Sequence, residues 1–188
     1  MNIEGKLHIW GNWLGLLCLC VILGFVLGEQ LICHDLPCPL CLLQRVAFVA
    51  IGMSILMNLC LGFRPAHYGL MLLSALLGFA ISLRQIILHF EPNDPGYGLP
   101  VLGHYMYTWA AIGFAIIIIL IATALILDQG INMEYKVQKK WGKALVGLFL
   151  SLILANGIST FLECGPFACP GDPTEYYLLH SHQCFFKD

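Results

Sequence analysis

The chain has 188 residues, of which 59% are hydrophobic and 11% are charged, with a formal net charge of −2 at pH 7. Soluble domains carry about a quarter charged residues, so this composition excludes an ordinary soluble globule. The charge balance offers no basic surface for nucleic acid. A mean hydropathy of +0.82 instead fits an integral membrane protein, whose apolar surface faces lipid.

Five apolar runs are long enough to cross a bilayer as helices, which takes about 20 residues each. They lie at 12–31, 42–62, 68–89, 106–127 and 144–162, and turn-forming or charged residues separate them. The sequence therefore predicts an all-α integral membrane protein, folded as a single membrane domain over residues 1–188.

The lysines and arginines of the short loops predict the orientation, because positive charge is retained on the cytoplasmic side. One set of loops holds Lys6, Arg64, Lys136, Lys139, Lys140 and Lys143, and the other holds only Lys187. We therefore expect a cytoplasmic amino terminus and an outer carboxyl terminus. The loops 32–41 and 90–105 and the tail 163–188 would then lie on the outer side.

This topology divides the nine cysteines into two groups. Cys18, Cys20 and Cys60 lie within spans, where a thiol serves mainly as a small packing residue. The six others fall on the predicted outer face: Cys33, Cys38, Cys41, Cys164, Cys169 and Cys184. Disulfides persist on that side of the membrane, so the pattern indicates thiol chemistry there.

The sharpest motif is Cys38-Pro39-Leu40-Cys41, directly before the second span. A C-x-x-C pair at a helix start brings two sulfurs within disulfide reach, and the helix dipole favours the thiolate. Arg45 lies at i+4 from Cys41 and adds positive charge on the same face. The pattern predicts a redox pair; a static disulfide or half of a zinc site remains an alternative.

A second arginine, Arg84, lies at a depth in the third span similar to that of Arg45 in the second. Charged residues within spans usually face a cavity or a partner. The two guanidinium groups would frame a cationic pocket beside Cys41 that suits a quinone, with His104 at its border. The alternative for Arg84 is that its side chain extends to the membrane interface.

The segment 37–47 closely resembles the disulfide bond formation protein B family of bacterial inner-membrane thiol oxidases, and residues 84–85, 94–98, 101–104 and 107–110 are similar to family sequence. The resemblance covers about 12–127. It implies a four-helix bundle, here with a fifth helix added. It also implies ubiquinone or menaquinone as the electron acceptor and a periplasmic DsbA-like protein of the thioredoxin fold as the partner.

When the roles of the family's residues are transferred to the matching positions, the resemblance implies that Cys38 and Cys41 form the quinone-coupled pair. It also implies that Arg45 supports quinone reduction. Well-known family members carry a second cysteine pair in the loop after the third helix, but residues 90–105 contain no cysteine. We hypothesise that Cys164 and Cys169 take that role, as in longer family variants with a similar tail. A static Cys164–Cys169 clip, or pairing with Cys33 or Cys184, stays open.

These features together predict a quinone-dependent thiol:disulfide oxidoreductase without a metal site. A reduced periplasmic dithiol protein would pass its electrons through the cysteine pairs to the membrane quinone pool. Two alternatives remain. One is an enzyme similar to vitamin K epoxide reductase, and the other is a non-enzymatic membrane module whose outer cysteines form structural disulfides or bind metal.

Overall fold

The computed structural model describes residues 3–32, 36–91, 96–98, 100–127, 134–135, 140–166, 169 and 176–180. Its helices are α1 (Ile3–Ile32), α2 (Pro39–Leu61), α3 (Pro65–Leu88), α4 (Met106–Leu127), α5 (Lys140–Cys164) and the short α6 (Tyr177–His180). The five long helices are all apolar and long enough to cross a membrane. The predicted all-α integral membrane fold is therefore confirmed, while the orientation of the termini stays a prediction.

Several helix ends differ from the expected spans. α1 begins at Ile3 rather than at residue 12, and α2 begins at Pro39 rather than at residue 42. Pro39 suits a first helical position, because proline lacks the N–H that would be unpaired there. α5 continues to Cys164 and so takes in two residues that the sequence assigns to the outer tail. These extensions bring Cys41 and Cys164 into helices.

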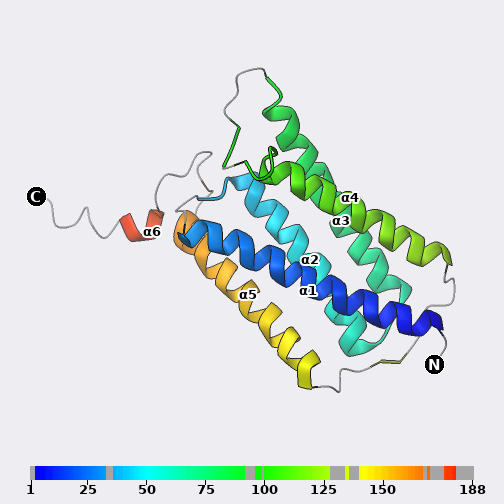
Figure 1. The fold of residues 1–188 in the computed structure, drawn as a ribbon. Helices are drawn as coiled ribbons and strands as arrows, with labels where there is room; N and C mark the ends of the chain where they lie inside the picture. The colour runs from blue at the N-terminus through cyan, green and yellow to red at the C-terminus, as the bar shows by residue number, and fades with distance from the viewer. Residues whose placement is uncertain are drawn as a thin grey trace, which may run out of the picture.

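The helices form a bundle in which α2 is central (Figure 1). α2 contacts α1, α3 and α5, and α4 packs against α3. The carboxyl ends of α1 and α5 lie at the same end of the bundle as the amino end of α2 (Figure 1). This arrangement gathers the candidate functional residues of three helices at one end.

A glycine permits the close packing of α5 on α2. The ring of Phe149, in α5, is fully buried and lies over Gly52 of α2, where an added Cβ would come within 2.1 Å of the ring. Gly78 of α3 receives the ring of Phe114 in the same way, at 2.3 Å. The fifth helix is thus packed into the bundle by a specific contact.

The outer surface of the bundle is strongly apolar. Large side chains such as Trp10, Val21, Leu73 and Leu154 are 64% to 72% exposed. A water-soluble protein would bury such a continuous apolar surface, whereas lipid chains solvate it. The exposure pattern therefore agrees with a protein that crosses the membrane several times.

A buried polar network ties α1, α2 and α3 together at the opposite end of the bundle. The Asn58 side chain donates to Asn12 Oδ1 at 3.1 Å, and the Asn12 amide donates to the Tyr68 hydroxyl at 3.0 Å. Nδ1 of His67 lies 3.0 Å from Asn58 Oδ1. Hydrogen bonds satisfy these polar groups, so burial costs them little.

Candidate active site

The two cysteines of the C-x-x-C motif form the amino end of α2. Cys38 is the N-cap residue, and its sulfur accepts a hydrogen bond from the Cys41 backbone N–H at 3.2 Å. Cys41 lies within the first helical turn, and both cysteines are free thiols. The pKa of the Cys38 thiol is raised, mainly because its sulfur is hydrogen-bonded to the Cys41 side chain and also because it is buried. These contacts therefore favour the thiol form of Cys38 over its thiolate.

Gln85 of α3 lies against both sulfurs. Its side-chain amide donates to Cys38 Sγ at 3.2 Å and to Cys41 Sγ at 3.4 Å. The Gln44 amide donates to Gln85 Oε1 at 2.8 Å, which turns the NH₂ group of Gln85 toward the sulfurs. Gln85 is fully buried. The amide is thus a preorganised hydrogen-bond donor for negative charge on either sulfur.

We expect a Gln85→Leu substitution to slow the reaction of the cysteine pair by between about 10- and 100-fold, because a hydrogen bond to a charged group contributes about 1.5–3 kcal/mol. The rate at which the reduced pair is alkylated, followed by mass spectrometry, measures this effect. Leu83→Ala is the matched control on the exposed face of α3. An unchanged rate in Gln85→Leu would contradict a role for the amide.

A cavity of about 300 Å³ opens between α1, α2 and α4 beside the cysteine pair. Its lining is mainly apolar and aromatic and includes Phe48, Tyr107 and Trp109. Cys41 and Arg45 also line it, one helical turn apart on α2. The cavity therefore places a thiol and a cation next to a space that suits a flat apolar ring.

Two side chains that the sequence analysis left out, those of Gln30 and Glu163, hold Arg45 or lie next to it. Its guanidinium donates to Gln30 Oε1 at 2.8 Å and to the Val26 carbonyl at 3.2 Å. The Gln30 amide donates in turn to Glu163 Oε2 at 3.1 Å. The feature that marks these residues, together with Gln44 and Gln85, is an amide or carboxyl group inside an apolar span, where such groups are costly and usually functional.

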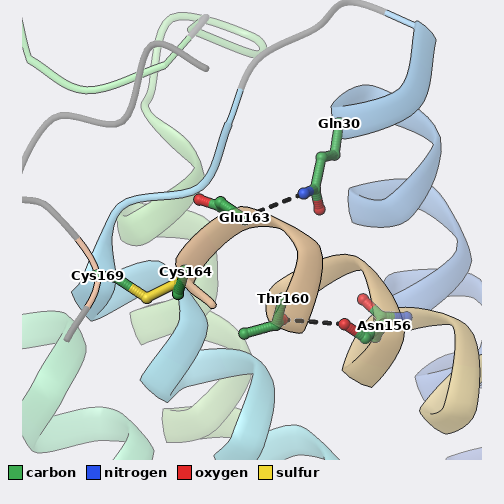
Figure 2. Close-up of a disulfide and its surroundings, with 6 residues drawn as sticks. All are labelled: Gln30, Asn156, Thr160, Glu163, Cys164 and Cys169. Carbon is green, nitrogen blue, oxygen red and sulfur yellow. Dashed lines mark hydrogen bonds between the residues drawn. A yellow bond between two sulfur atoms is a disulfide. The ribbon is translucent and has the colours of Figure 1, made fainter. Parts of the chain in front are cut away.

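A disulfide joins Cys164 at the end of α5 to Cys169, with the two Cα atoms 4.6 Å apart. Figure 2 shows it beside Glu163, which accepts a hydrogen bond from Gln30 of α1. Cys164 is buried and Cys169 is partly exposed. The pairing that the sequence left open is therefore Cys164 with Cys169, while Cys33 and Cys184 lie outside the described residues.

Arg84 and His104 do not reach the cavity. Both side chains are exposed, and neither lines the space beside Cys41. α3 turns its next residue, Gln85, toward α2, so Arg84 points away about 100° around the helix. His104 lies in a turn bridged to Val101 and meets Trp109 edge-on at 6.1 Å. The expected pocket of two arginines is corrected accordingly: of this pair, the structure brings only Arg45 to the cavity.

Fold and site together define a class of protein: a multi-pass helical membrane protein with a vicinal cysteine pair at the mouth of its bundle. Comparison with known proteins shows what this chain is similar to. Residues 9–98 match the family model for disulfide bond formation protein DsbB. This part of the chain is therefore similar to the DsbB family, in agreement with the resemblance that the sequence motifs indicate.

Several curated relatives carry the same family name. The chain is 37% identical over 95 residues to disulfide bond formation protein B of Chromobacterium violaceum, an overlap of 46% of this chain and 57% of the relative. It is 36% identical over 92 residues to disulfide bond formation protein B 1 of Pseudomonas syringae pv. syringae, covering 47% and 53%. The chain thus spans about half the length of the curated relatives it matches. No solved structure matches it.

Proposed function

We propose that the protein is a quinone-dependent thiol:disulfide oxidoreductase of the bacterial inner membrane. It would reoxidise a periplasmic dithiol protein of the thioredoxin fold and pass the electrons to ubiquinone or menaquinone. The observation that carries this proposal is that Cys41 and Arg45 line one cavity, with Cys38 beside them at the helix start. The match of residues 9–98 to the DsbB family model supports a role in disulfide bond formation.

The residues around the cavity fit a quinone. Phe48, Tyr107 and Trp109 offer flat apolar surfaces for a ring, and Arg45 offers N–H donors for a carbonyl oxygen. A quinone bound there would accept two electrons and two protons as the dithiol becomes a disulfide. Arg45 would orient the acceptor and stabilise negative charge that develops on its oxygen.

The cysteine pairs would exchange electrons by thiolate attack on a disulfide. The partner's dithiol would first reduce Cys164–Cys169, with attack at Cys169 because it is the more exposed of the two residues. The resulting dithiol would reduce the Cys38–Cys41 disulfide, and the reduced Cys38 and Cys41 would give two electrons and two protons to the quinone. Each exchange step breaks one disulfide and forms another. In the last step the Cys38–Cys41 disulfide forms again as the quinone is reduced.

Redox trapping of the full chain in proteoliposomes tests this function. After addition of a reduced thioredoxin-fold protein, we expect Cys38 and Cys41 to accumulate as alkylatable thiols without quinone. Addition of a short-chain ubiquinone would return them to the disulfide. Cys60, an exposed free thiol at the other end of α2, is the internal control, because its alkylation should not change. If the state of Cys38 and Cys41 does not respond to quinone, the pair is structural.

A further inference from the structure

Three helices meet in one hydrogen-bonded chain behind the cavity. Glu163 comes from α5, Gln30 from α1 and Arg45 from α2. Gln30 Nε2 donates to Glu163 Oε2 at 3.1 Å, as Figure 2 shows, and Arg45 Nη1 donates to Gln30 Oε1 at 2.8 Å. Gln30 is 1% exposed and Glu163 is 0% exposed. The contacts are therefore shielded from water, where competing hydrogen bonds would weaken them.

The hydrogen bonds that link Arg45, Gln30 and Glu163 can run in one direction only. A carboxylate accepts hydrogen bonds and cannot donate them, and a guanidinium donates and cannot accept. The amide of Gln30 has one end of each kind, so Glu163 takes its NH₂ group and leaves its oxygen for Arg45. Without an acceptor at position 163, the buried NH₂ group of Gln30 would lose this partner, and the amide would be free to turn away from Arg45.

Only one of the three residues lines the cavity. Arg45 reaches it, whereas Gln30 and Glu163 lie outside its lining. The hydrogen bonds of Glu163 therefore reach the cavity through Gln30 and Arg45. It also lies outside residues 9–98, the part of the chain that matches the DsbB family model. The fifth helix thus adds a contact to the arginine that the matched region does not contain.

We propose that α5 completes the acceptor site: Glu163 is a positioning residue that holds the Arg45 guanidinium toward the cavity through the Gln30 amide. This inference rests on the proposed function, because it assigns to Arg45 the binding of the quinone oxygen. The proposed role of Glu163 gives the fifth helix a second function, in addition to holding the Cys164–Cys169 disulfide. Loss of Glu163 should therefore weaken quinone binding and leave the thiols intact.

Steady-state kinetics of the full chain in nanodiscs test the proposal, with dithiothreitol as reductant and a short-chain ubiquinone as the varied substrate. We expect Glu163→Leu to raise KM for the quinone about five- to tenfold, with a smaller change in kcat, because one buried hydrogen bond that positions Arg45 is lost. Glu163→Gln should restore KM to within about twofold, since its side-chain oxygen can still accept from Gln30.

Two further variants separate positioning from simple helix docking. Asn156→Leu removes another buried polar contact of α5 with α1, in which Asn156 Nδ2 lies 3.5 Å from the Leu23 carbonyl. It should leave KM unchanged. In an Arg45→Met background, Glu163→Leu should add no further rise in KM, because residues that act through one another are not additive.

Each result decides the question. An unchanged KM in Glu163→Leu, an equal rise in Asn156→Leu, or an additive rise in the Arg45→Met background would overturn the positioning role. Quenching of Trp109 fluorescence by the same ubiquinone provides a readout that is independent of turnover, because Trp109 lines the cavity. If the wild type turns over quinone and Glu163→Leu has no effect, this inference alone is refuted. If the wild type shows neither quinone turnover nor quinone binding, the proposed function itself is refuted.

Discussion

A Cys41→Ser substitution is expected to lower quinone reduction by about 1000-fold or more, the scale of loss when a group that makes and breaks bonds is removed. Cys41 is the cysteine of the pair that lines the cavity, so it is the sulfur nearest to the proposed acceptor. A serine hydroxyl cannot form a disulfide with Cys38, and the two electrons then have no donor. The rate of ubiquinone reduction with dithiothreitol, followed by absorbance, measures the loss.

Cys60→Ser is the matched control for this substitution. Cys60 lies on the same helix, is also a free thiol and is exposed at the far end of α2 from the cavity. The same chemical change there should leave the rate within about twofold of the wild type. A Cys41→Ser protein that still reduces quinone at a comparable rate would show that another thiol is the electron donor.

The fold was largely predictable from the sequence because the bilayer restricts the possible structures. A chain that crosses hydrocarbon must satisfy its backbone internally, so each long apolar run becomes a helix. The ends of the helices were less predictable, since they depend on local contacts. α5 continues to Cys164, where the charge of Glu163 suggests a loop, because Gln30 of the neighbouring helix binds that carboxyl group within the protein.

The site was predictable where the residues that form it are close in sequence. Cys38, Cys41 and Arg45 share one helix start, so their spacing alone places Cys41 and Arg45 on one face. Gln30 and Gln85 come from other helices, and their positions depend on how those helices are rotated. For the same reason Arg84 was misplaced: depth in the membrane follows from sequence position, but the direction of a side chain follows from helix packing.

Replacing both Cys164 and Cys169 with serine is expected to separate partner oxidation from quinone reduction. Oxidation of a reduced thioredoxin-fold protein should fall on the order of 100-fold, because the relay then lacks a tethered disulfide that works at high effective concentration. The Cys38–Cys41 pair retains its cap, its contact with Gln85 and its place beside the cavity. Quinone reduction with dithiothreitol should therefore stay within about threefold of the wild type. The two rates, measured on one preparation, give the comparison.

The double substitution is needed because a single one leaves a free thiol that can form mixed disulfides. Cys18→Ser, at an exposed free thiol in α1, controls for the general effect of removing a sulfur. If the double variant oxidises the protein substrate as fast as the wild type, the Cys164–Cys169 bond is a static clip and the partner reacts directly with Cys38 or Cys41. The buried position of Cys38, which is 6% exposed, argues against that direct route, because a large protein thiolate needs access to the sulfur it attacks.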